Sequence, residues 1–345
     1  MAISDHMSGT PEHKYREIDH AKLSIAPEEK LEDWSSTGRS STPTINDGSV
    51  AVGARRFQDN VTRIPGSFFE GDIRGDNLPN VPAVLTGLLE EWPAFENPGV
   101  SWSVQDLAAR TESANRVSLD GGPFFARNSM CSGKVSMKEY QRYCENDADG
   151  DLAPLYVFDP YHLESKFANG SLVQADFSIP PCFSTDAMSC CNGTRFRPLP
   201  PAWLLIGALS SGTPIHDHPL TVAWNALLTG CKLWCCLPPD VDESLLLLTL
   251  DEDSDEDFDL SAMQWFRQCG DLPTSARIIV QRPGEVVYLP VGWFHVVLNV
   301  ETSTAISVSL TLHRDLPALM PLLMESDEEF ATFWMKHLDQ GLVFD

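Results

Sequence analysis

A series of short strand-like runs between residues 203 and 312 constrains the fold more than any other feature of this sequence. Each run is rich in β-branched or aromatic residues, and Gly, Pro and Asn punctuate the intervals between them. Many short strands at close spacing are typical of a sandwich or barrel of the jelly-roll type. The sequence therefore predicts a mainly β fold with flanking helices. The predicted strands are 203–209, 214–218, 221–228, 232–237, 277–281, 286–289, 295–300 and 304–312.

The flanking regions differ in composition from this β-rich part. Residues 1–55 are rich in Ser, Thr, Asp and Glu without a sustained period, which predicts a disordered tail. The next region is predicted to contain short strands at 81–89 and 155–158. It also has predicted helices at 103–109 and 136–143, which each begin at a Ser cap. We expect four parts: the tail, an N-terminal portion at 56–195, a β-barrel core at 196–313 and a helical segment at 314–345.

The C-terminal segment carries the pattern of an amphipathic helix. Residues 326–329 have the form of a capping box, and Phe330, Phe333, Trp334 and Leu338 follow on one face. Packing against the barrel is the simpler interpretation of this face. A homodimer contact through the helix is the alternative.

The charge is strongly and unevenly negative. The chain has 49 acidic and 24 basic residues and a net charge of −25, which argues against a nucleic-acid groove lined with Lys and Arg. Residues 251–259, DEDSDEDFD, form an acidic insert in the barrel core. Such a block is usually a solvated loop. The alternative is an electrostatic guide for a basic protein or peptide substrate.

The sequence suggests an intracellular protein of the cytoplasm or nucleus. No apolar run is long enough to cross a bilayer, and the first residues lack the basic and apolar regions of a secretory signal, so we expect no membrane association. The nine cysteines are an odd number in a chain too long to need disulfides, and we interpret them as reduced thiols.

Three histidines form the clearest candidate site. His216 and His218 are two positions apart, so their side chains leave the same face of a strand, whereas Asp217 points to the other face. His295 begins a later strand directly after a turn. Two ligands from one strand and a third from a neighbour can build a facial metal site in a barrel wall. Spacing alone leaves a structural histidine pair about as plausible as a ligand pair.

The motifs around these histidines identify a family. SGTPIHDHPLTVAWNALLTGCKLW contains the pair, and GEVVYLPVGWFHVVLNVETSTAIS contains His295. Together with PLYVFD (154–159) and RPLPPAWLLIGAL (197–209), they resemble the JmjC family of iron(II)- and 2-oxoglutarate-dependent oxygenases. The resemblance runs from about residue 60 to 312. Within the family, the sequence is most similar to the branch of the bifunctional arginine demethylase and lysyl hydroxylase once described as a phosphatidylserine receptor.

The resemblance implies a fold, a reaction and a set of site residues. The fold is a double-stranded β-helix, a cupin-like jelly roll with Fe(II) in the barrel mouth, and the reaction converts 2-oxoglutarate and O2 to succinate and CO2. His216 and His295 match iron ligands. Positions that bind 2-oxoglutarate in the family correspond to Tyr156, Asn225, Lys232 and Ser307. A buried dicarboxylate needs a cation at its far end, which Lys232 provides.

Position 218 departs from the family pattern. The family motif is His-x-Asp, whereas this chain has His218 where the carboxylate belongs. The sequence therefore predicts three imidazole ligands from His216, His218 and His295. Such a site carries no negative charge of its own, and imidazole sets suit Zn, Cu, Ni and Fe alike.

Three hypotheses follow. The first is an Fe(II)/2-oxoglutarate-dependent oxygenase that hydroxylates a protein side chain, with lysine favoured because of the branch resemblance. The second is a non-catalytic JmjC-fold binding or scaffold protein, motivated by His218. The third is a cupin-like dioxygenase that uses a three-histidine site without 2-oxoglutarate, which would leave Lys232 and Tyr156 without a function.

Overall fold

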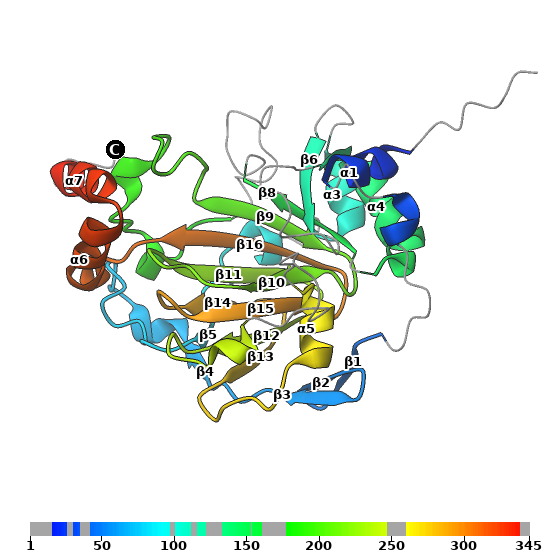
Figure 1. Ribbon diagram of the computed structural model, residues 1–345, viewed down its shortest axis with the longest axis horizontal. Coiled ribbons are helices and arrows are strands. Elements are labelled where there is room, and N and C mark those ends of the chain that lie inside the picture. Colours follow the sequence, from blue (N-terminus) through cyan, green and yellow to red (C-terminus); the bar gives the residue numbers. More distant parts are fainter. Residues whose placement is uncertain are drawn as a thin grey trace, which may run out of the picture.

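The protein folds around two β-sheets that face each other and form a barrel, as the sequence predicts (Figure 1). The computed structural model describes residues 16–25, 30–34, 42–96, 101–111, 116–121, 133–152, 154–160, 177–246 and 260–338. The acidic insert at 251–259 and the end of the C-terminal segment at 339–345 lie outside the described residues.

The larger sheet has nine strands and the smaller sheet four. The larger sheet runs in the order β4 (Arg63–Pro65), β5 (Ala83–Thr86), β14 (Val286–Leu289), β11 (Val222–Thr229), β16 (Ser303–Leu310), β9 (Ala202–Gly207), β8 (Leu155–Asp159), β6 (Arg116–Gly121) and β7 (Gly133–Ser136). The smaller sheet runs in the order β10 (Gly212–His216), β15 (Phe294–Asn299), β12 (Lys232–Leu237) and β13 (Arg277–Gln281). Every pair within the sheets is antiparallel except β4 with β5.

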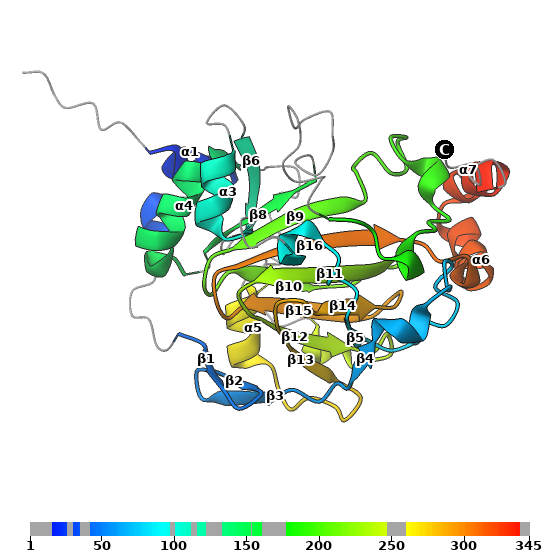
Figure 2. The same cartoon turned by 180° about the vertical axis from the view of Figure 1, so that it is seen from behind.

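Helices flank the sheets, and a third, small sheet lies beside the barrel (Figures 1 and 2). The small sheet consists of β1 (Thr44–Asn46), β2 (Ser49–Val52) and β3 (Arg55–Gln58). The helices are α1 (Glu17–Ile25), α2 (Pro93–Glu96), α3 (Val104–Arg110), α4 (Met137–Asn146), α5 (Ala262–Gln268), α6 (Leu316–Ser326) and α7 (Glu328–Leu338). Short 3-10 turns are η1 (Leu31–Trp34), η2 (Gly66–Phe69), η3 (Ala148–Gly150), η4 (Pro181–Phe183), η5 (Ser189–Cys191), η6 (Glu243–Leu245) and η7 (His313–Asp315).

The alternation of side chains along each strand separates the barrel interior from the outer cores. On β11, Trp224 and Ala226 belong to the outer core under the helices, whereas Ala223 packs with residues of the smaller sheet inside the barrel. On β12, Leu233 and its alternate neighbours belong to the core shared with α5, so Lys232 takes the inward direction. The strand period thus places polar side chains inside an otherwise apolar barrel.

The predicted disorder of residues 1–55 is wrong for part of that range. Helix α1 lies against β7, and Ile18 and Ile25 join the main core. Lys22 forms a buried ion pair with Asp151, with 2.6 Å between Nζ and Oδ1. The small sheet packs its β2 against α5. These contacts join segments far apart in sequence, so local composition does not show them.

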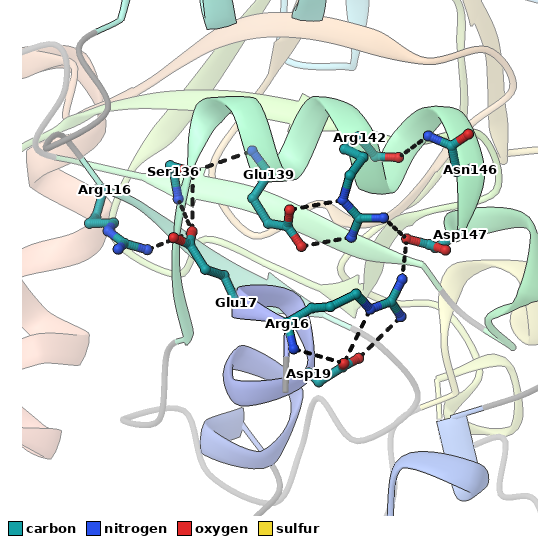
Figure 3. A network of polar contacts seen from close by, with 9 residues as sticks. All are labelled: Arg16, Glu17, Asp19, Arg116, Ser136, Glu139, Arg142, Asn146 and Asp147. Carbon is teal, nitrogen blue, oxygen red and sulfur yellow. Dashed lines mark hydrogen bonds and ion pairs between the residues drawn. The ribbon is translucent and has the colours of Figure 1, made fainter. Parts of the chain in front are cut away.

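A polar network adds to the docking of α1 (Figure 3). The Glu17 carboxylate pairs with Arg116 and accepts hydrogen bonds from the backbone N–H and hydroxyl of Ser136. The Arg16 guanidinium donates to Asp147, which also pairs with Arg142 of α4. Because this network is partly exposed, we assign most of the docking energy to the buried apolar face of α1.

The predicted helices are confirmed with one change at the C-terminus. Ser103 caps α3 and Ser136 caps α4. The α7 helix begins one residue later than the capping-box pattern predicts, because Asp327, not Ser326, accepts from the Phe330 N–H at 2.9 Å. Phe330 stacks on both Phe196 and Trp334, so the apolar face packs within the chain. The dimer contact stays a prediction.

None of the helices within the described ranges is both long and apolar enough to cross a membrane.

Candidate metal and co-substrate site

The three predicted histidines converge at one end of the barrel interior. One nitrogen from each of His216, His218 and His295 lies within 4.8 Å of the other two, which is the spacing of a set that can share one metal ion. His216 ends β10 and is the direct cross-strand partner of His295 on β15. His218 lies beyond the end of β10, so the predicted continuous strand through 218 is too long. The chain after β10 nevertheless brings His218 back to the other two rings.

Backbone carbonyls fix the tautomers of two of these histidines. The Nδ1 of His216 lies 2.8 Å from the Pro214 carbonyl oxygen, and the Nδ1 of His295 lies 3.1 Å from the Trp293 carbonyl oxygen. A carbonyl oxygen only accepts, so Nδ1 carries the proton in both rings and Nε2 keeps its lone pair. An imidazole held in this way is a pre-oriented Nε2 ligand for a metal.

Burial keeps the rings of His218 and His295 neutral, which a metal ligand requires. Burial, and secondarily the charge of His216, lowers the pKa of His218 to about 4. The pKa of His295 is shifted well below its usual range, mainly by burial and then by the two neighbouring histidines. Trp234 stacks on His295 with 6.0 Å between ring centroids. His218 and His295 therefore offer uncharged nitrogen ligands at neutral pH.

Lys232 lies fully buried inside the same barrel. It is 0% exposed, and its ammonium donates to the Tyr156 hydroxyl at 3.0 Å and to Asn299 Oδ1 at 2.6 Å. An ammonium group has three donors, and no described residue accepts from the third. Burial lowers the pKa of Lys232 to about 7. No carboxylate among the described residues forms an ion pair with Lys232 that would oppose this shift. A buried cation of this kind is prepared for an anionic ligand.

The other predicted co-substrate residues line the same cavity. Asn225 is 3% exposed, and its Oδ1 has no hydrogen-bond partner among the described residues. The Ser307 hydroxyl lies beside it on the paired strand β16 and donates to the Trp224 carbonyl oxygen at 3.2 Å. Tyr156 is 2% exposed and reaches the cavity from β8. All the predicted site residues thus lie around one space.

The cavity has a volume of about 340 Å³, within the range of small-molecule sites. Its lining joins the three histidines to the four predicted co-substrate residues. Phe158 and Trp203 line another part, with 4.5 Å between their ring centroids. The cavity therefore has room for a small dicarboxylate and for part of a second molecule.

Sequence reasoning missed the residues that support Lys232. Asn299 is 0% exposed and accepts from both Lys232 and the Ser303 hydroxyl, at 2.6 Å each. Its Nδ2 donates to the Ser211 hydroxyl at 2.9 Å. Asn299 stands in the quoted motif HVVLNVETS, four residues after His295, but nothing local indicates that it faces Lys232. The cross-strand register of β12 with β15 makes the two residues direct partners.

The donor set fits Fe(II) and 2-oxoglutarate. Three neutral imidazoles suit several divalent metals, including iron, and leave positions open for other ligands. The free donor of Lys232 suits a carboxylate, and the orphaned Asn225 oxygen shows that a polar group of the cavity is unsatisfied without a ligand. The missing anionic ligand at position 218 changes the charge of the centre without removing a ligand.

Comparisons with known proteins agree with this geometry. The family model described as "JmjC domain, hydroxylase" matches residues 203–310, which contain all three histidines. A bifunctional arginine demethylase and lysyl-hydroxylase, psr-1 of Caenorhabditis elegans, is 27% identical over 94% of this chain and 78% of its own length.

The alignments with two further relatives cover smaller shares of those proteins. The arginine-specific demethylase JMJ22 of Arabidopsis thaliana is 31% identical over 72% of this chain and 46% of its own. The 2-oxoglutarate and iron-dependent oxygenase JMJD4 of Mus musculus is 24% identical over 76% of this chain and 62% of its own. With the barrel and the histidine centre, these matches show that residues 203–310 correspond to a JmjC domain and that the chain is similar to JmjC-domain proteins beyond it.

Proposed function

We propose that this protein is an Fe(II)/2-oxoglutarate-dependent oxygenase that hydroxylates a protein side chain, with lysine as the favoured target. The observation that carries the proposal is the joint placement of the histidine centre and the Lys232 ammonium in one cavity. A metal-only scaffold has no need of a buried, uncompensated cation. Relatives named as oxygenases, hydroxylases and demethylases support the same reaction class.

Each predicted site residue in the cavity has a defined role in this proposal. His216, His218 and His295 would hold the iron through ring nitrogens. Lys232 would pair with the distal carboxylate of 2-oxoglutarate, assisted by the Tyr156 hydroxyl. Asn225 and Ser307, which are cross-strand partners, would hold the co-substrate between them and the metal. When bound, iron and 2-oxoglutarate would support oxidation by O2: one oxygen atom would enter the succinate that 2-oxoglutarate yields together with CO2, and the other would enter the hydroxylated side chain.

The aromatic wall of the cavity supports a basic substrate. The rings of Phe158 and Trp203 are half-buried, so they leave aromatic surface accessible beside the centre. A lysine side chain places its aliphatic stem against such surfaces, and its ammonium is attracted to the ring faces. The net charge of −25 would also attract a basic protein or peptide.

Turnover of the co-substrate tests the proposal. Iron-loaded protein is incubated with 2-oxoglutarate, O2 and lysine-containing basic peptides, and succinate formation and peptide mass are followed. We expect succinate release and a mass gain of one oxygen, with His295→Ala as the inactive control. Succinate release no greater than that of His295→Ala would refute the proposal.

The second candidate is a non-catalytic JmjC-fold binding protein, and the histidine at position 218 is the observation that favours it. A barrel that had lost catalysis would be free to lose its co-substrate residues, whereas Lys232, Tyr156 and Asn225 remain together in the cavity. Purified protein that contains zinc and has no affinity for 2-oxoglutarate would favour this candidate. Stoichiometric iron together with 2-oxoglutarate binding would exclude it.

A further inference from the structure

The buried end of the cavity is organised around Asn299, a residue outside the predicted site. Asn299 ends β15 and is the direct cross-strand partner of Lys232 on β12. Its Oδ1 accepts from two donors, the Lys232 ammonium and the Ser303 hydroxyl, at 2.6 Å each. Its Nδ2 donates to the Ser211 hydroxyl at 2.9 Å. The carboxamide is therefore fixed on both sides, and its oxygen is aimed at Lys232.

The surrounding backbone also fixes the position of Asn299. Its N–H donates to the Ser211 carbonyl at 2.8 Å, and its own carbonyl accepts from the Ser210 N–H at 2.9 Å. Gly207 of β9 lies directly against the carboxamide, and a Cβ added there would overlap the Asn299 side chain and approach the Tyr156 ring. The space that Gly207 leaves open is thus occupied by the group that holds Lys232.

Asn299 binds the Lys232 ammonium without supplying an opposite charge. A carboxamide oxygen accepts a strong hydrogen bond from an ammonium group but carries no net charge. In the part of the chain that the structure describes, the other titratable groups found to interact with Lys232 are the Tyr156 hydroxyl and the preceding Cys231 thiol. Burial raises the pKa of Tyr156 well above its usual value and that of Cys231 to about 11, so both are neutral near pH 7. Gln281, the partner of Lys232 on β13, is uncharged.

We propose that Asn299 is a positioning residue that anchors the Lys232 ammonium without forming an ion pair with it, so that the ammonium remains available to pair with a dicarboxylate. This inference rests on the proposed function, because it assigns the anion to the 2-oxoglutarate site. A carboxylate at position 299 would form an internal ion pair with Lys232. The ammonium would stay in place but would no longer need an anionic ligand.

The isosteric substitution Asn299→Asp tests this inference. Two quantities are measured: the titration of the Lys232 side chain by NMR, with its signal assigned through its absence in Lys232→Met, and the Kd of 2-oxoglutarate with Fe(II) in the absence of O2. We expect the Lys232 titration to move up by about 1 to 3 pH units, because an opposite charge within about 4 Å favours the ammonium form. We expect the Kd to rise roughly tenfold to a hundredfold, the effect of losing a charge-assisted contact.

Two other variants distinguish the effect of an added charge from the effect of losing the Asn299 hydrogen bonds. Asn146→Asp adds the same charge on the exposed end of α4, and we expect neither quantity to change. Asn299→Ala removes the anchor without adding charge. It should weaken 2-oxoglutarate binding several-fold, and it should not raise the measured pKa of the Lys232 side chain. It also keeps the inference testable if Asn299→Asp fails to fold, which circular dichroism would show.

The outcomes distinguish this inference from the proposed function. If wild-type protein binds 2-oxoglutarate and Asn299→Asp binds it equally well, with an unchanged Lys232 titration, the inference is wrong and the proposed function stands. If Asn299→Ala binds as tightly as wild type, Asn299 is no positioning residue. If wild-type protein loaded with Fe(II) does not bind 2-oxoglutarate at all, the proposed function fails and the inference fails with it.

Discussion

The imidazole rings of His216 and His295 lie 4.1 Å apart between centroids, because the two residues are direct partners on β10 and β15. Both rings carry their proton on Nδ1, which donates to a backbone carbonyl. Their Nε2 atoms therefore serve as acceptors or ligands. Together with His218 they form a centre without an anionic ligand from the chain, in contrast to the His-x-Asp motif of the family.

Replacing His218 with Asp should increase iron retention. The carboxylate adds a negative charge beside a divalent cation, and a cation–carboxylate attraction is strong in a half-buried site. We expect more iron per chain after dialysis against a weak chelator, and faster conversion of 2-oxoglutarate to succinate. His218→Ala, which removes the ligand without adding charge, is the matched control. Equal or lower activity of the Asp variant would indicate that the third imidazole is adapted to the reaction of this protein.

Replacing Lys232 with Met should abolish tight 2-oxoglutarate binding while preserving the fold. Methionine retains most of the buried stem but supplies no donor to the distal carboxylate. A hydrogen bond to a charged group contributes about 1.5 to 3 kcal/mol, so we expect the Kd to rise at least roughly tenfold. Iron content should not change, because Lys232 is no metal ligand. An unaltered Kd would place the co-substrate elsewhere.

The stability of the metal-free protein should show the titration of Lys232. The unfolded chain keeps the lysine proton up to about pH 10.5, whereas the folded protein releases it near pH 7. Between these values the unfolded state binds more protons, so this group makes the folded state more stable as pH rises. Below pH 7 both states hold the proton, so the full free-energy cost of burying the ammonium lowers the stability of the folded state.

The comparison with Lys232→Met isolates this effect from the other titrating groups. The variant should be more stable than wild type at pH 7, by up to roughly 5 kcal/mol given the lowered pKa. Its advantage should shrink steadily as pH rises toward 10. Urea denaturation of both proteins at each pH gives the difference directly. An advantage that does not vary with pH would mean that Lys232 is neutral or solvated in the fold.

Replacing Lys22 with Met should destabilise the fold and leave the site intact. Lys22 pairs with Asp151, which also accepts from the Tyr143 hydroxyl, and both charged side chains are at most 10% exposed. Removing the cation leaves a buried carboxylate without its partner, which costs about 3 to 5 kcal/mol. We expect a lower urea midpoint and an unchanged Kd for 2-oxoglutarate. The exposed pair Lys30 with Glu32 provides the control, since Lys30→Met should have almost no effect.

The local sequence predicted the barrel strands closely. The expected runs 232–237, 277–281 and 286–289 coincide with β12, β13 and β14, because alternation and turn residues are properties of short segments. The capping serines of α3 and α4 were equally readable. The three histidines and the co-substrate residues came from family motifs, and the structure places them around one cavity.

The helix α1 and the strands β1 and β2, which lie within the first 55 residues, could not be predicted from composition. The α1 helix is stabilised by burial against β7 and by the ion pair of Lys22 with Asp151, 129 positions away. The position of His218 was also beyond local reasoning, because it follows the end of β10 and reaches the centre through the loop. Both depend on contacts that exist only after the chain has folded.

The sequence by itself determined the strand pattern, the identity of the three imidazoles and the presence of a lysine on an inward-facing strand position. Tertiary structure alone decided that Lys232 meets an uncharged partner, Asn299, and that no described carboxylate reaches it. The physical reason is that a charge inside a barrel is governed by the groups across the sheet, and strand register, not sequence proximity, selects those groups.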